Sequence, residues 1–148
     1  MTQKLLILLF FLSPLLMKSQ SLVWKTSISD AITLSNEEKK PMLILFTTNY
    51  ASNDLQSEVF ETPDFERWSV KNVILVKIDL SDPSVSADMR EQNVLLKNAF
   101  GVEDLPEVCF ANASIRKGKT FFDSLGKVHY TSGGAKKWIS DSNYILNP

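Results

Sequence analysis

Cysteine and histidine are nearly absent from this 148-residue chain, which holds one of each, Cys109 and His129. A single cysteine cannot close an internal disulfide or form a dithiol redox centre. One cysteine and one histidine also supply too few ligands for a zinc site. We therefore expect no metal and no cofactor, and we assign no catalytic residue except as the alternative that Cys109 offers below.

An excess of positive charge is also missing. Lysine and arginine number 16 against 17 aspartate and glutamate residues, so the formal net charge is −1. This balance gives no electrostatic footprint for nucleic acid or for an anionic membrane. The basic stretch formed by Arg116, Lys117 and Lys119 is open to two interpretations, a contact for an acidic partner or a solvated loop, and we favour the loop.

The longest apolar run is too short to cross a membrane. It extends from Leu5 to Met17, follows Lys4 and is interrupted by Pro14, whereas a spanning helix needs about 20 apolar residues. Small and polar residues follow it up to Ser21, which is the layout of a secretory signal peptide. We predict a signal peptide over residues 1–20, a domain over residues 21–148, no membrane span after cleavage, and a periplasmic or extracellular location. Cleavage would leave a net charge of −3.

Within residues 21–148, apolar patterning predicts alternating helices and strands. The predicted helices cover residues 27–39, 53–62, 86–100 and 135–146, and the predicted strands cover residues 42–46, 72–79, 107–110 and 127–131. Ser52 or Asn53 is the expected cap of the second helix, and Pro63 its end. The stretch 111–120 is expected to be a polar loop, after which Phe121 and Phe122 resume a strand and Gly126 turns the chain into the last strand.

The third helix is expected to present one apolar face, formed by Met89, Val94, Leu95, Ala99 and Phe100. A strand–helix–strand unit requires a parallel pair with a right-handed crossover, and the last two strands can pair antiparallel. The predicted fold class is therefore α/β, with three α/β/α layers around a central mixed sheet.

The order of these elements and several stretches of sequence resemble the thioredoxin-like superfamily. The matching stretches are KPMLILFT, LQSEVF, VILVKIDL, FGVEDLP and DSLGKVHY, and TSGGAKKWI is similar to exported bacterial members. The resemblance covers residues 24–146 and implies a thioredoxin-like fold.

The resemblance breaks at the site of the family's Cys-x-x-Cys motif. When the segment is aligned from the preceding strand, Tyr50 replaces the family's tryptophan, and Ala51 and Asp54 replace the two cysteines. When it is aligned from the following helix, Asn49 and Ser52 replace the two cysteines. The two alignments disagree because the segment 48–54 is shorter than in close relatives. Neither places a sulfur there, so dithiol–disulfide oxidoreductase activity is not expected.

The resemblance also implies that Pro106 is a cis-proline beside the former active site. Extended peptides dock there by pairing with the backbone of the preceding residue, here Leu105. We therefore predict a non-catalytic module that binds extended peptides or exported and envelope proteins. Its predicted groove is formed by Asn49, Tyr50, Ala51, Ser52, Leu105 and Pro106.

The alternative is a thiol–disulfide oxidoreductase or isomerase activity through Cys109 alone. Free cysteine is among the most buried residue types, and we favour a core position for it. Other polar groups are expected to lie on the surface: His129 faces solvent or a groove, and Asp54, Glu58 and Glu61 form a solvated helix face. Packing positions are expected for three tryptophans, Trp24, Trp68 and Trp138.

Overall fold

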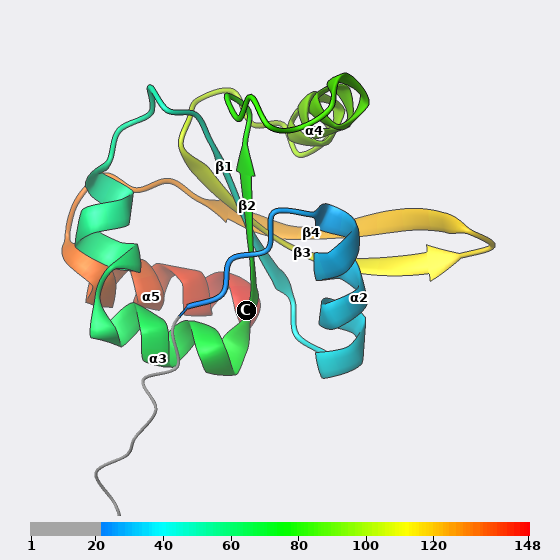
Figure 1. Ribbon diagram of the computed structural model, residues 1–148. Helices are drawn as coiled ribbons and strands as arrows, with labels where there is room; N and C mark the ends of the chain where they lie inside the picture. The colour runs from blue at the N-terminus through cyan, green and yellow to red at the C-terminus, as the bar shows by residue number, and fades with distance from the viewer. Residues whose placement is uncertain (1–21) are drawn as a thin grey trace, which may run out of the picture.

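A four-stranded mixed sheet forms the centre of the molecule in the computed structural model, which describes residues 22–148 (Figure 1). The predicted signal peptide lies outside these residues. The strands are β1 (Met42–Thr47), β2 (Ile74–Asp79), β3 (Glu107–Arg116) and β4 (Lys119–Val128). The helices are α2 (Ile28–Glu38), α3 (Pro63–Asn72), α4 (Ala87–Ala99) and α5 (Gly134–Leu146), with a π-helical turn, η2 (Gln56–Phe60), before α3.

The strand order is β2-β1-β3-β4. β1 pairs in parallel with β2 and antiparallel with β3, so Met42 lies between Ile74 and Ala111. The first five residues of β1 are buried, as expected of an apolar strand that is covered on both faces. Upstream of α2, Lys25 adds a short parallel bridge to β2 at Val76.

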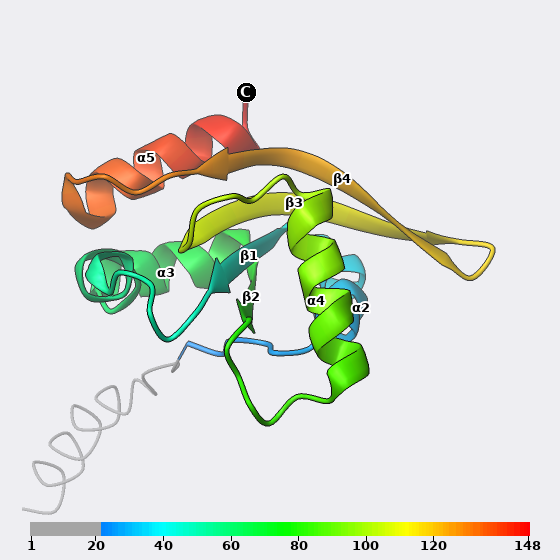
Figure 2. The same ribbon diagram turned by 90° about the horizontal axis from the view of Figure 1, so that it is seen from above.

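Helices cover both faces of the sheet (Figure 2), and each face buries its own apolar cluster. α3, α5 and η2 cover one face over Leu43, Leu45 and Val108, and α2 and α4 lie over the other. The first cluster holds Trp68 and Trp138, whose rings meet edge-on at 5.6 Å, a favoured aromatic geometry. Trp24 packs partly buried against it. The predicted three-layer α/β/α fold is confirmed, and all three tryptophans pack as expected.

The predicted break before Pro63 is present, because η2 ends at Phe60, but Pro63 also begins a further helix, α3, that was not predicted. Proline is favoured at the first helical position, where its missing N–H has no intrahelical acceptor. Thr62 caps α3 by accepting the Phe65 N–H at 3.3 Å. The capping residues for α2 and α4 are Ser27 and Ser86.

The stretch 111–120 is a β-hairpin, so the predicted loop is wrong. β3 continues to Arg116, and the turn residues Lys117 and Gly118 have φ angles of 52° and 73°. Beyond Ala111, where pairing with β1 ends, the two strands project from the sheet as a ribbon, the β3–β4 arm (residues 112–123) (Figure 1).

β4 also differs from the predicted last strand. It is continuous from Lys119 to Val128 and passes through Gly126, which therefore does not turn the chain. The pairing shifts by one residue between Phe110 and Ala111. Gly126 has a φ of 150°, and a Cβ there would lie 3.0 Å from Ile145 of α5, so the absence of a side chain lets α5 pack closely on β4.

The predicted apolar face of α4 is also wrong, except at Phe100. The residue of α4 that is buried is Asn93, and the partly buried Leu96 and the following Phe100 pack on the second cluster. By contrast, Leu95 is 60% exposed and Val94 42% exposed. The helix carries apolar residues around its circumference, so its contacts with the sheet decide which of them face inward.

Candidate functional site

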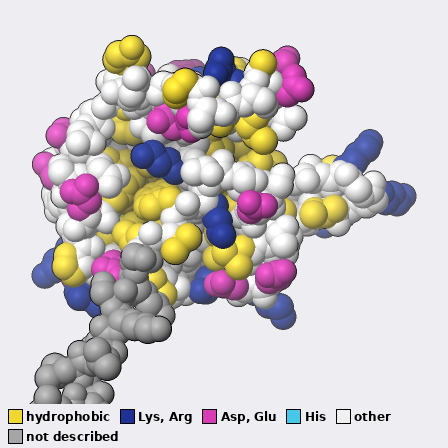
Figure 3. Space-filling view, viewed as in Figure 1, with side chains coloured by type: hydrophobic (Ala, Val, Ile, Leu, Met, Phe, Trp, Pro, Cys, Tyr) yellow, Lys and Arg dark blue, Asp and Glu magenta, His cyan; other side chains and the backbone are white. Residues whose placement is uncertain are grey.

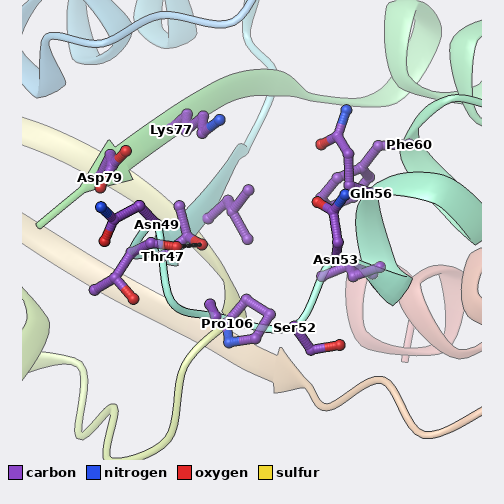
Figure 4. A pocket seen from close by; sticks show the side chains of 13 residues that line it. Thr47, Asn49, Ser52, Asn53, Gln56, Phe60, Lys77, Asp79 and Pro106 are labelled. Atoms are coloured by element: carbon purple, nitrogen blue, oxygen red, sulfur yellow. Dashed lines mark hydrogen bonds between the residues drawn. The ribbon is translucent and has the colours of Figure 1, made fainter. Parts of the chain in front are cut away.

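A cavity of about 450 Å³ opens where β1 and β2 end and η2 begins (Figure 4). Its floor is apolar and consists of Leu45, Leu55 and Phe60, while its rim is mostly polar. Ligands of α/β sheets commonly bind outside the carboxyl ends of the strands. This cavity lies at such an edge, next to the segment that replaces the family's Cys-x-x-Cys motif.

One rim of the cavity is the turn that follows β1. The Ala51 N–H donates to the Thr48 carbonyl oxygen at 3.2 Å. The Asn49 N–H donates to Ser81 Oγ at 2.8 Å, which fixes this turn to the chain that follows β2. Hydrogen bonds thus hold this rim of the cavity in place.

The opposite wall comes from β2 and η2. Lys77 and Asp79 alternate with inward residues of β2 and line the cavity, and Gln56 lines it from η2 (Figure 4). The sequence analysis missed these three residues. The signal for Lys77 was present, since a lysine inside an otherwise apolar strand marks a position that opens to solvent.

The start of the helical segment follows the cavity directly. Ser52 Oγ accepts the Asp54 N–H at 3.3 Å, but Asn53, the other predicted cap, is the residue that immediately precedes the helical segment. Asn53 contributes through its backbone, whose carbonyl oxygen accepts the Ser57 N–H at 3.0 Å. The Asn53 side chain therefore stays free to line the cavity.

Four of the six predicted groove residues meet at the cavity: Asn49, Ala51, Ser52 and Pro106. Tyr50 does not line the cavity, because it stands at the tip of the turn and is 91% exposed. Leu105 directs its side chain into the second cluster, against the other face of the sheet. The Leu105–Pro106 peptide bond is cis, as the resemblance implies.

Cys109 lies in the interior of β3, opposite Ile44 of β1, and its exposed fraction is 0%. Burial, with a smaller contribution from Glu107, raises the pKa of its thiol from 9.0 to about 12. The thiolate is the nucleophilic form of cysteine. At neutral pH Cys109 is therefore a neutral core side chain, as the favoured interpretation predicted.

One further polar contact joins η2 to the segment that follows β4. Tyr130, which follows β4, donates a hydrogen bond to the carboxylate of Glu58 in η2. This bond raises the pKa of the Tyr130 phenol. Glu61 accepts from Gln56 Nε2 at 3.3 Å, so two of the three predicted surface acids have structural contacts.

The remaining candidates bring together no reactive cluster. His129 is exposed, as expected, but it lies just after the end of β4 at Val128 and not within a strand as predicted. Within residues 22–148, no group of three histidine, cysteine, aspartate or glutamate side chains is placed to hold a metal ion. None of the helices described here has the length and apolar character to cross a membrane.

Solved structures match this arrangement over most of the chain. The DsbH oxidoreductase superposes with a TM-score of 0.67 at 21% identity and covers 84% of each chain. A thioredoxin from Thermus thermophilus gives 0.63 at 14% identity and covers 86% of this chain and 88% of its own. The protein therefore has a thioredoxin-like fold, and its single cysteine means that it carries no Cys-x-x-Cys motif.

One curated relative shows sequence similarity. The thioredoxin-related protein DsbJ of Chlamydia pneumoniae is 28% identical over 92 residues, which are 60% of this chain and 26% of that protein. The chain thus spans about a quarter of the relative's length. No family model matches the chain.

Proposed function

We propose that this protein is an exported module that binds extended polypeptide segments without forming a covalent bond to them. The observation that carries the proposal is the cavity at the carboxyl ends of β1 and β2, where ligands of α/β sheets commonly bind, and whose lining residues hold no sulfur. The similar proteins are a thioredoxin-related protein and a Dsb oxidoreductase, which supports a role connected with thiol–disulfide chemistry.

Two features of the rim favour a peptide over a small molecule. The cavity is open on the side of Ser52, which is exposed, and it is bordered by Pro106 at the start of β3. An extended chain beside Leu105 and Pro106 would add main-chain hydrogen bonds and place alternate side chains toward the protein. The export prediction implies that the bound segments belong to exported or envelope proteins.

The test is direct binding to an array of overlapping extended peptides from exported proteins, followed by fluorescence anisotropy. We expect Ser52→Trp to abolish binding, because Ser52 is exposed and an indole there fills the mouth of the cavity. Gln92→Trp, on the exposed side of α4, is the matched control and should bind normally. Binding that is equal in both variants, or absent from the array altogether, would contradict the proposal.

The burial of Cys109 argues against the alternative function, which is redox chemistry through its thiol. We expect Cys109 to resist iodoacetamide in the native protein and to react fully in denaturant, as read by mass spectrometry. Rapid native alkylation at neutral pH would revive the alternative.

A further inference from the structure

The cavity wall holds one ammonium group, that of Lys77, whose N–H donors have no partner in the described part of the chain. We propose that the cavity accepts the side chain of an acidic residue from a bound peptide, with the carboxylate on Lys77. This inference rests on the proposed peptide-binding function and names the chemistry of the segment that the site prefers.

The argument begins with the two charged residues of the cavity wall. Asp79 accepts hydrogen bonds on Oδ1 from the Ser81 N–H at 2.9 Å and from Ser81 Oγ at 2.5 Å. Lys77 makes no side-chain hydrogen bond or ion pair with any residue in the described part of the chain. One oxygen of the Asp79 carboxylate therefore accepts from neutral donors, whereas the Lys77 ammonium group has no acceptor among the described residues.

The placement of Lys77 directs that charge into the cavity. Its neighbours Val76 and Ile78 are buried on the other face of β2. Figure 4 shows the lysine side chain extending from β2 toward the side of the cavity where Gln56 and Phe60 lie. A ligand entering from the Ser52 side meets the ammonium group across the cavity.

The remaining lining suits an amphipathic side chain. Leu45, Leu55 and Phe60 offer a floor for methylene groups. The side-chain amides of Asn49 and Asn53 line the rim and form no hydrogen bond with the described residues. A carboxylate offers about four acceptor positions, so these amides can bind it together with Lys77.

Competing side chains fit less well. An apolar side chain would remove water from Lys77 without giving it a partner, which costs free energy. A basic side chain would face the ammonium group as a like charge. The whole chain has a net charge of −1 and gives acidic peptides no general attraction, so the preference must come from this local contact.

The test compares three labelled eight-residue peptides, rich in valine and threonine, that differ only in a central glutamate, glutamine or lysine. For the unmodified protein we expect the glutamate peptide to bind about tenfold more tightly than the glutamine peptide, as for a hydrogen bond to a charged group. Lys77→Gln should remove this difference. Lys119→Gln, at the far end of the β3–β4 arm, should retain it.

Each outcome separates the two proposals. If the glutamate and glutamine peptides bind equally and Ser52→Trp blocks both, the groove is real and the acidic preference is wrong. If the lysine peptide binds best, Asp79 and not Lys77 sets the preference, and the inference is wrong. If none of the peptides binds while Lys77→Gln and the unmodified protein share the same melting temperature, both proposals are wrong.

Discussion

The backbone N–H of Asn49 donates to Ser81 Oγ at 2.8 Å across 32 residues of sequence. Ser81 in turn donates to Asp79 Oδ1 at 2.5 Å. These two bonds tie the turn that replaces the family's redox motif to the end of β2. The rim of the cavity therefore depends on a serine that touches no predicted groove side chain.

Replacing Ser81 tests whether the rim of the cavity depends on it. We expect Ser81→Ala to accelerate amide hydrogen exchange at Asn49 by about fivefold, since a lost hydrogen bond corresponds to about 1 kcal/mol. Peptide binding at the cavity should weaken in parallel. The measurement is hydrogen exchange followed by NMR.

Ser84 provides the control, because it makes the same pair of contacts with Asp82, at 2.8 Å and 2.6 Å, outside the cavity lining. Ser84→Ala should leave exchange at Asn49 unchanged. Equal effects of the two variants would mean that the Ser81 bond does not hold the turn.

The Cys109 thiol predicts a specific loss of stability at alkaline pH. Its folded pKa of about 12 lies above the ordinary 9.0, so the folded form keeps its proton while the unfolded chain loses it. The stabilising contribution is complete below pH 9 and falls as pH rises toward 12. At pH 10 the loss amounts to about 1.4 kcal/mol.

Cys109→Ala is the comparison, because it lacks the ionising group but keeps Tyr130 and the lysines. Its free energy of unfolding should be lower at pH 7, from the smaller side chain, yet should decline less steeply between pH 8 and pH 10. Parallel slopes in urea titrations would show that the thiol ionises normally in the folded protein.

Two tryptophans of one cluster differ in how their indole N–H groups are satisfied. Trp68 Nε1 donates to Asn143 Oδ1 at 2.7 Å and joins α3 to α5, whereas Trp138 Nε1 is buried with no partner among residues 22–148. We expect Trp68→Phe to lower the free energy of unfolding by about 1 kcal/mol more than Trp138→Phe does. Chemical denaturation of both variants measures this difference.

Asn143→Ala removes the acceptor of the Trp68 hydrogen bond and is the control for the comparison of the two tryptophan variants. If the hydrogen bond causes the difference, Trp68→Phe should cost much less in the Asn143→Ala background. Additive losses would assign the effect of Trp68 to packing alone.

Restoring cysteines should not restore redox activity. In the family, a helix N-terminus stabilises the thiolate of the first cysteine. Here Ala51 belongs to the turn that begins at Thr48, and helical structure starts only at Asp54. We expect Ala51→Cys with Asp54→Cys to show little or no turnover in an insulin-reduction assay. Robust turnover would show that the geometry of the site is intact.

The sequence predicted the sheet centre well because β1 and β2 are nearly continuous apolar runs. It failed for the β3–β4 hairpin because its residues are mostly small or polar. A signal was nevertheless present: Ala111, Ala113 and Ile115 alternate with polar residues, and Lys117-Gly118 with positive φ angles forms a two-residue hairpin turn.

The candidate site was predictable only in part. Alignment to a motif located the turn from Asn49 to Ser52 and Pro106, since these residues stand at fixed places relative to recognisable strands. Lys77 and Gln56 approach them only through tertiary packing. Tyr50 is exposed because it stands in a local turn. Its alignment with the family's tryptophan predicted a groove position for it instead.

The β3–β4 arm extends past the end of β1, so the outer edge of each of its two strands has no neighbouring strand in the sheet. Such edges are templates for the addition of strands from other copies, which leads to aggregation. Figure 3 shows lysine and arginine side chains at the free end of the arm. Arg116, Lys117 and Lys119 thus bring like charges together whenever two arms approach tip to tip, so charge repulsion opposes this mode of self-association.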